Sequence, residues 1–338
     1  AGYRGGANIG FAGNVYVGNN AGYWHDAGGS VFIGSSAGQN FMSGSYNVGI
    51  GRNALRGYVT SSAIGNYNVA IGEESGYNWK SSFNSVAIGY RAGREGGGSR
   101  DNTLIGAYAG YVMSGSQQYN TYVGSSAGYG RNLGSSNVAV GANALGGTDW
   151  KPLSSVNGDW TGITAVGYYA GQYAANSFAV YVGYEAGRYS AGSSNNFFGY
   201  FAGRGSQTTA PYGNGSGNIG IGREALQSIQ SGSNNIAMGR DSLEILTHHQ
   251  DSIAIGTYAG RYASGSYNLF MGSYAGYGGT TSAPYSSGQY NVAVGYYALK
   301  GFTSAAGNTA IGYQASMDVT TGGYNTSLGY RAGYNVTS

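Results

Sequence analysis

The sequence predicts an all-β protein, a parallel β-solenoid (β-roll) of about 18 coils. Three observations lead to this prediction. A variant of Asn-Val-Ala-Ile-Gly-x-x-Ala-Gly recurs along the chain, mostly every 16–18 residues, and a short fixed period is the signature of stacked repeats. Glycine accounts for 66 of the 338 residues, which disfavours helix because glycine is costly inside one. Within each copy, β-branched residues alternate with small ones, which is typical of a short strand.

Each copy of the motif is anchored on a glycine, and the interval between anchors is longer at four places. The four expanded coils lie near residues 55–66, 145–163, 204–217 and 277–290. The copies run through residues 1–338 as a single continuous array, which could itself be part of a longer one. The anchor glycines are Gly18, Gly34, Gly51, Gly72, Gly89, Gly106, Gly124, Gly141, Gly167, Gly183, Gly199, Gly222, Gly239, Gly256, Gly272, Gly295, Gly312 and Gly329.

The three residues before each anchor form the expected strand, as in Val69-Ala70-Ile71. The first is mostly Val, Ile or Thr, the third is apolar in every copy, and the middle one is usually Ala or Gly. Because side chains alternate between the two faces of a strand, we expect the Val and Ile residues to point inward together. The middle residue then points outward, where its small size lets another surface approach closely.

The residue four positions before the anchor is Asn in most copies and Ser in several others. Stacked coils place these side chains above one another, so that their amides can form a hydrogen-bonded ladder. Asn also tolerates a left-handed backbone conformation, which suits a turn that leads into a strand. The predicted ladder comprises Asn47, Asn68, Asn102, Asn120, Asn137, Asn291, Asn308 and Asn325.

Two further positions of the repeat also have structural explanations. The anchor glycine supplies the turn out of the strand. Three residues later, Ala or Ser appears in every copy, which fits a tight inner corner where nothing larger can be packed. We therefore interpret the repeat itself as scaffold, and expect any specific recognition where the period breaks.

Composition argues against several classes of function. The chain has no cysteine, so it has neither a disulfide framework nor a thiolate metal site. Its net charge of +3 comes from scattered arginines, which predicts no nucleic-acid partner. No apolar stretch approaches the roughly 18 residues that a membrane span needs, so no membrane insertion is expected. We also expect no catalytic residues, no cofactor and no metal site.

Two short segments contain groups that could bind a metal or transfer a proton. His248-His249 with Asp251 offers metal ligands, and Glu73-Glu74 offers a carboxylate pair. Adjacent residues on a strand point to opposite faces, so neither pair is expected to converge on one ligand.

The longest expanded coil holds the candidate recognition loop, with Asp149, Trp150, Asp159 and Trp160. An exposed Trp beside a carboxylate suits stacking on a sugar ring and hydrogen bonding to its hydroxyls. The two aspartates could also form a glycosidase pair, which requires a set separation between the carboxyl groups. Ordinary packing of a surface loop is the structural alternative.

The repeat motif resembles that of a known family. The segments Asn68-Val69-Ala70-Ile71-Gly72, Ser85-Val86-Ala87-Ile88-Gly89 and Asn291-Val292-Ala293-Val294-Gly295 resemble the head repeats of YadA-like trimeric autotransporter adhesins. Asn308-Thr309-Ala310-Ile311-Gly312-Tyr313-Gln314-Ala315 is similar to repeats of bacterial surface fibres and phage tail fibres. The resemblance implies a left-handed parallel β-roll, packing of three chains, and a surface that binds host matrix.

These observations lead to one functional hypothesis and two alternatives. The chain is expected to be a non-enzymatic structural subunit of an extracellular filament or surface fibre, with copies of itself as partner in a homopolymer or homotrimer. The first alternative is a trimeric adhesin or phage tail fibre that binds a host glycan, matrix or cell-surface receptor. The second is a polysaccharide-degrading tail spike that uses Asp149 and Asp159. Each of these hypotheses implies a location at the cell surface, outside the cell or on a virion tail. If the chain is secreted, we expect a signal segment to have been removed.

Overall fold

The fold is built from short β-strands joined by turns. The computed structural model describes residues 13–41, 43–57, 65–113, 117–130, 134–147, 160–174, 176–205, 213–245, 248, 250–279 and 285–337. Within these residues there is no helix, and the paired strands are all parallel. The predicted all-β parallel solenoid is therefore confirmed. The described residues accordingly contain no helix long and apolar enough to span a membrane.

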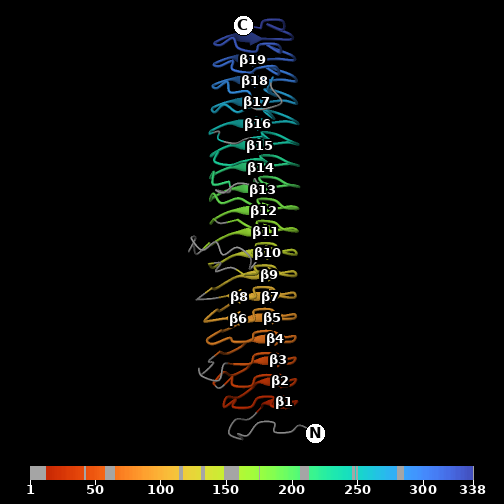
Figure 1. Cartoon of the computed structure of the whole chain (residues 1–338), viewed down its shortest axis with the longest axis vertical. Coiled ribbons are helices and arrows are strands. Elements are labelled where there is room, and N and C mark those ends of the chain that lie inside the picture. The colour runs from red at the N-terminus through yellow and green to blue at the C-terminus, as the bar shows by residue number, and fades with distance from the viewer. Residues whose placement is uncertain are drawn as a thin grey trace. The chain divides into compact units, whose positions relative to one another are not determined.

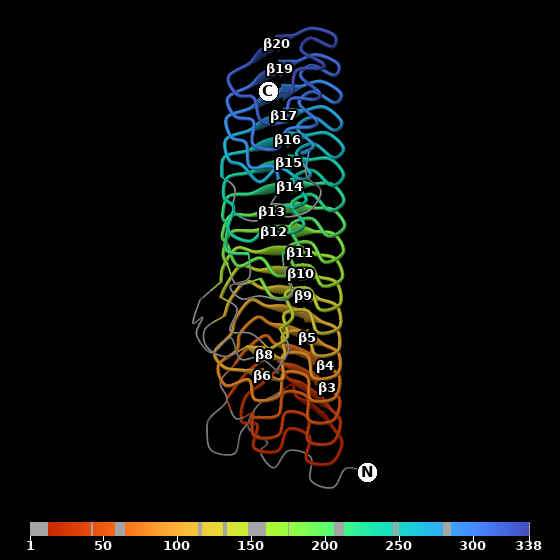
Figure 2. The same ribbon diagram turned by 45° about the horizontal axis from the view of Figure 1, so that its top comes forward.

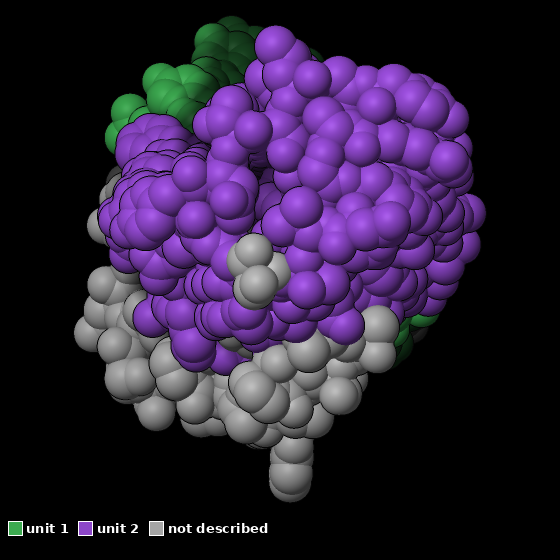
Figure 3. All heavy atoms as spheres, turned by 90° about the horizontal axis from the view of Figure 1, so that it is seen from above, with its two compact units in different colours: residues 1–169 green, residues 170–338 purple. Residues whose placement is uncertain are grey.

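The chain divides into two compact units, residues 1–169 and 170–338, which are coloured separately in Figure 3. Each unit contains the same repeat and is described by itself. The first unit contains β1 (Val15–Val17), β2 (Val31–Ile33), β3 (Val48–Ile50), β4 (Val69–Ile71), β5 (Val86–Ile88), β6 (Glu95–Gly96), β7 (Thr103–Ile105), β8 (Val112–Met113), β9 (Thr121–Val123), β10 (Val138–Val140) and β11 (Thr164–Val166). The second contains β12 (Val180–Val182), β13 (Asn196–Phe198), β14 (Ile219–Ile221), β15 (Ile236–Met238), β16 (Ile253–Ile255), β17 (Leu269–Met271), β18 (Val292–Val294), β19 (Thr309–Ile311) and β20 (Thr326–Leu328).

Within each unit, the strand before the anchor glycine pairs in parallel with the same strand of the next coil (Figure 1). In β4 and β5, for example, Ala70 lies opposite Ala87 and Ile71 opposite Ile88. Figure 2 shows successive coils of a unit following one another as parallel loops of chain. The two remaining strands, β6 and β8, pair with each other as a small second sheet. Equivalent repeat positions therefore form rows that run from coil to coil.

The middle residue of each strand faces the interior, and its two neighbours face outward. Ala70 and Ala87 are fully buried, whereas the Val and Ile residues on either side of them are only partly buried. The expectation that Val and Ile point inward is therefore wrong, and so is the outward placement of the small residue. The reason is that the coil is narrow, so that its interior has space for only one side chain of each strand, and in most coils a small one.

The interior is filled by matching the middle strand residue to the residue four positions after the anchor. Where the first is aromatic, the second is glycine: a Cβ atom added at Gly38 would lie 2.4 Å from the ring of Phe32. Where the second is leucine, the first is small, as for Gly49 and the fully buried Leu55. Each coil thus holds one large side chain at most at this pair of positions. Close packing of an interior makes such size matching necessary.

The turns explain the other invariant positions. The anchor Gly72 has φ +127°, and a Cβ atom there would lie 2.6 Å from the carbonyl oxygen of Gly89 in the next coil. No other residue fits at such a position, because both the backbone conformation and the contact exclude a side chain. The left-handed residue before the strand is Tyr67, at φ +58°, and not the ladder residue Asn68. The backbone explanation of the ladder asparagines is therefore wrong, and hydrogen bonding accounts for them.

Candidate functional site

The asparagines four positions before the anchor form a continuous hydrogen-bonded row in the first unit. Oδ1 of Asn102 accepts a hydrogen bond from the backbone N–H of Asn120 at 2.9 Å, and Oδ1 of Asn120 accepts one from Asn137 at 2.9 Å. Each side-chain amide also donates to a backbone carbonyl of the following coil, such as Asn120 to Gly134 at 3.2 Å. Asn47 and Asn68 make the same contacts earlier in the row.

The second unit has the same row, and its members include asparagines beyond those predicted. Asn291, Asn308 and Asn325 follow one another through N–H to Oδ1 bonds of 2.9–3.0 Å. The row also contains Asn195, Asn218, Asn235 and Asn268. Serine replaces asparagine at some coils: the hydroxyl of Ser85 accepts from the N–H of Asn102 at 3.2 Å. Except for Asn325, which is only partly buried, these side chains are buried and already hydrogen-bonded, so their role is to hold coils together.

Of the candidate recognition loop, only Trp160 lies within the described residues; Asp149, Trp150 and Asp159 lie outside them. Trp160 is buried, with 8% of its surface exposed, and its carbonyl accepts a hydrogen bond from Asn137 at 2.9 Å. Its ring is therefore part of the core and is not the exposed platform that sugar stacking requires. Residues 58–64, 148–159, 206–212 and 280–284 of the expanded coils also lie outside the described residues.

Described side chains of the segments 248–251 and 73–74 contact separate partners. Nδ1 of His248 lies 2.7 Å from the hydroxyl of Ser231, and Asp251 accepts a hydrogen bond from Asn234 at 3.2 Å. His249 lies outside the described residues. Glu73 pairs with Arg52 at the surface.

Glu74 is held by two arginines of the next coil. Its Oε2 accepts from Nε of Arg91 at 2.9 Å and from Nε of Arg94 at 2.8 Å. Burial raises the pKa of the Glu74 carboxyl, but the hydrogen bonds and charges of Arg94 and Arg91 outweigh burial and hold it below its ordinary value. Glu74 is therefore a stable anion at neutral pH, bound to its own counter-charges and unsuited to proton transfer.

His25 is a buried histidine whose protonation state follows from its partners. Nε2 lies 2.8 Å from the carbonyl oxygen of Gly44, which can only accept, so Nε2 carries the hydrogen. Nδ1 lies 2.6 Å from the hydroxyl of Tyr16, which donates to it. Burial lowers the pKa of His25. Both ring nitrogens are thus used within the coil stack, which assigns His25 to structure.

The outward strand residues create an apolar strip on each unit. We call the residues just before the anchor glycine the outer aliphatic row; away from the end coils, several expose 36–39% of their surface. In the first unit these are Ile33, Ile105, Val140 and Val166, and in the second Phe198, Ile221, Met238, Met271 and Ile311. Parallel, in-register pairing places neighbouring members one coil apart. The row is therefore a repeated and partly exposed apolar surface.

Tyrosines form further rows of stacked rings at the surface. Tyr46 and Tyr67 stack with ring centroids 5.2 Å apart, and Tyr267 and Tyr290 do the same at 5.2 Å. One residue after the anchor glycine, Tyr184 stacks on Tyr200, Tyr296 on Tyr313, and Tyr313 on Tyr330. Offset-stacked rings at this spacing attract each other, so these tyrosines stabilise the stack while leaving apolar faces and hydroxyls at the surface.

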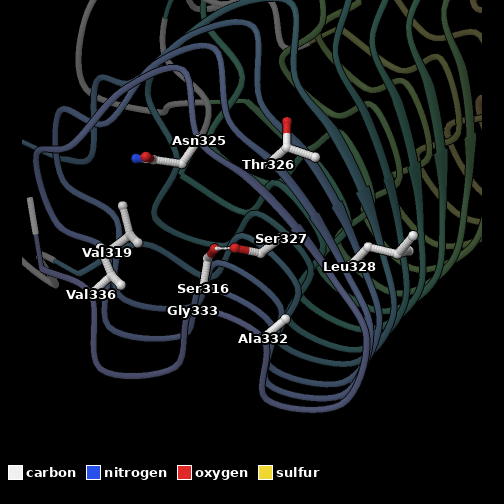
Figure 4. Close-up of a pocket in the computed structure, with 9 residues that line it drawn as sticks. All are labelled: Ser316, Val319, Asn325, Thr326, Ser327, Leu328, Ala332, Gly333 and Val336. Atoms are coloured by element: carbon white, nitrogen blue, oxygen red, sulfur yellow. Dashed lines mark hydrogen bonds between the residues drawn. The ribbon is translucent and has the colours of Figure 1, made fainter.

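A hollow of about 470 Å³ lies at the last coil, beside β20 (Figure 4). Its lining includes Asn325 and, from β20, Thr326 and Leu328, with Val319 and Val336 on the side away from Leu328. In the preceding coils, the equivalent positions are covered by the coil that follows, as Asn308 is by the N–H of Asn325. The hollow corresponds to the space that a further coil would fill, and we do not assign a ligand to it.

Comparisons with known proteins do not identify a relative: no protein-family model and no curated protein matches the sequence. The resemblance to adhesin head repeats and to fibre repeats therefore rests on the repeat motif alone. The described geometry, above all the outer aliphatic row, is the remaining basis for a function.

Proposed function

We propose that this chain is a non-enzymatic structural subunit of an extracellular filament or surface fibre. Copies of the chain associate side by side through the outer aliphatic row and end to end by stacking of coils. The observation that carries the proposal is the row itself, because it places an apolar side chain at the surface of one coil after another. Contiguous apolar strips of this kind on a protein surface mark interaction sites.

The energy available from the row is substantial because it is repeated. Full burial of an Ile or Met side chain contributes roughly 1.5–3 kcal/mol, so covering the exposed third of each contributes about 0.5–1 kcal/mol. Members one coil apart are separated by about 4.8 Å, the spacing of paired strands. A straight partner surface with the same spacing can therefore cover many of them at once, and a second copy of this chain has that spacing.

End-to-end stacking is supported by the uniformity of the contacts between coils. Most coils offer the next one the same strand pairing and the same Asn acceptor, in the first unit as in the second, and some offer a serine hydroxyl instead. A coil of one chain can therefore stack on a coil of another without a specialised interface. Exposed strand edges are templates for such pairing.

The alternative of a glycan-binding adhesin or tail fibre has less support. It depends on exposed aromatic and carboxylate side chains in the candidate recognition loop, and Trp160 is buried. The tail-spike alternative depends on Asp149 and Asp159, which lie outside the described residues. The filament hypothesis is the one that a described surface favours.

The proposal is tested by removing the row and measuring assembly. The variant Ile221→Thr/Met238→Thr/Met271→Thr replaces three partly exposed apolar side chains with a residue that favours strands. Wild-type chain at micromolar concentration is expected to sediment as large assemblies. The triple variant is expected to need at least tenfold more protein to assemble, as measured by sedimentation velocity, with an unchanged circular dichroism spectrum.

A second variant provides the control. Tyr119, Tyr267 and Tyr290 are exposed and left-handed, and Asn occupies the equivalent position at Asn84 and Asn234. Replacing the three tyrosines with Asn removes as many apolar side chains away from the row, and assembly should persist. A wild-type chain that remains a 34.7 kDa monomer, or equal effects of the two variants, would contradict the proposal. A discrete trimer would favour the adhesin alternative instead.

A further inference from the structure

Three coils carry a glutamate at the second position after the anchor glycine: Glu74, Glu185 and Glu224. In the first two cases, arginines supply the counter-charge. Glu74 is bound by Arg91 and Arg94 of the next coil at 2.9 and 2.8 Å, and Glu185 is likewise contacted by two arginines. In both of these coils the carboxylate therefore has two guanidinium groups beside it.

The coil that follows Glu224 reverses this charge pattern. Arg91 and Arg94 occupy the second and fifth positions after their anchor glycine, and the same two positions of the coil after Glu224 hold Asp241 and Glu244. One carboxylate oxygen from each of Glu224, Asp241 and Glu244 lies within 4.8 Å of the other two. We call these three residues the acidic cluster.

Arginines contact Glu224 and Glu244 of the acidic cluster. Arg223 donates to Oε1 of Glu224, with its Nη2 at 2.8 Å. Nε of Arg261 donates to Oε2 of Glu244 at 2.5 Å. Each of these contacts uses one named oxygen of its carboxylate. Arg223 is largely exposed, so solvent weakens its effect on the cluster.

Asp241 is the member without an adequate partner. It is 5% exposed, and its Oδ1 is buried with no hydrogen-bond partner among the described residues. The nearest guanidinium nitrogen, Nε of Arg240, is 3.7 Å from the other oxygen, too far for a hydrogen bond. Burial raises the pKa of the Asp241 carboxyl, and the charges of Glu224 and Glu244 raise it further, which together outweigh the opposing charge of Arg261. Asp241 thus lies beside two other carboxylates, and one of its own oxygens is buried without a hydrogen bond.

We propose that Glu224, Asp241 and Glu244 bind a divalent cation of the oxygen-preferring class, with Ca²⁺ as the first candidate. Ca²⁺ takes six to eight oxygen ligands in flexible geometry. The three carboxylates supply protein ligands from two successive coils, and water completes the shell. The cation takes the place that Arg91 and Arg94 fill beside Glu74, and so joins two coils of the second unit. This inference is independent of whether the chain forms filaments.

Calcium titration of the full-length chain tests the site. After dialysis against EDTA and removal of the chelator, isothermal calorimetry with CaCl₂ is expected to show binding at about 10⁻⁴–10⁻³ M, the range of extracellular calcium modules. The same calcium concentrations should raise the melting temperature. Asp241→Asn, which keeps the shape of the side chain, should weaken binding at least tenfold. Glu74→Gln, at the arginine-bound equivalent position, should leave it unchanged.

Three results would overturn the proposal. The first is the absence of any Asp241-dependent binding up to 10 mM CaCl₂, about tenfold above the weakest affinity expected. The second is equal weakening by Asp241→Asn and Glu74→Gln. Without metal, the raised pKa makes the folded chain hold a proton at Asp241 more tightly than the unfolded chain does. Stability should then increase as the pH falls toward the ordinary pKa of an aspartate. If this acid stabilisation is the only effect of Asp241, a proton shared with Glu224 fills the site and the cation proposal fails.

Discussion

The size of one side chain decides how each coil is packed. Phe197, in the middle of β13, lies against Gly203, where an added Cβ atom would be 2.2 Å from its ring. In the next coil the arrangement is exchanged, with Gly220 in the strand and the fully buried Leu226 four positions after the anchor. Both Gly203 and Leu226 have φ near +55°, so the backbone of this position accepts either residue. The volume inside the coil therefore limits which side chains can occupy these two positions together.

This predicts a compensating pair of substitutions. Gly203→Leu alone overfills the coil and should lower the free energy of unfolding by about 1–3 kcal/mol, and Phe197→Gly alone should cost about 3–5 kcal/mol through the cavity it leaves. The double variant reproduces the Gly220–Leu226 arrangement and should be at least about 2 kcal/mol more stable than the sum of the two losses indicates. Denaturation of the four chains measures this coupling. Additive losses would show that the two positions do not share one volume.

At the scale of the repeat element, hydrogen bonding fixes one coil on the next. Asn120 accepts the backbone N–H of Asn137 and donates to the carbonyl of Gly134, and its side chain is completely buried. A buried backbone group that loses its partner costs about 1–3 kcal/mol. The ladder residue therefore contributes through two backbone groups of the next coil rather than through its own backbone conformation.

Substitution at Asn120 should separate these two contributions. Asn120→Ala leaves both groups unpaired and should cost about 2–4 kcal/mol, with faster hydrogen exchange at the Asn137 amide. Asn120→Ser should cost about half as much, because the serine hydroxyl still accepts the N–H, as Ser85 does. The exposed Asn84, one position before the ladder, is the control, and Asn84→Ser should change stability by less than about 0.5 kcal/mol. Equal effects of Asn120→Ala and Asn84→Ser would exclude the ladder as a source of stability.

The repeat elements also show what a sequence of this kind reveals. Period, strand position and row spacing follow from the recurrence of the motif, and the strands before Gly72 and Gly89 lie where expected. The inward face does not follow, because Val69-Ala70-Ile71 alternates equally well with either face inside. The width of the coil decides between them. A single strand gives no signal for it.

The sequence alone does not predict the acidic cluster, for a related reason. Glu224, Asp241 and Glu244 are separated in the sequence and belong to two coils, and a count of acidic residues over the whole chain gives no indication that they meet. Alignment of the copies on their anchor glycines would have provided a signal, since acids stand where the coil after Glu74 has arginines.

At the scale of the whole molecule, the outer aliphatic row is the feature that ordinary folding does not explain. The interior is filled by the middle strand residues and by residues after the anchor. The residue just before the anchor does not contribute to it, yet this residue is apolar in every copy. In the filament hypothesis this residue is selected for contact between chains. The apolar side chains of the row then contact a second chain, and they do so only after assembly.

Cryo-electron microscopy of the full-length wild-type chain at micromolar concentration tests this claim most directly. We predict filaments or lateral bundles, with a coil spacing of about 4.8 Å along the axis and contacts between chains that cover Ile221, Met238 and Met271. Discrete short particles of single chains, with these side chains facing solvent, would contradict the account.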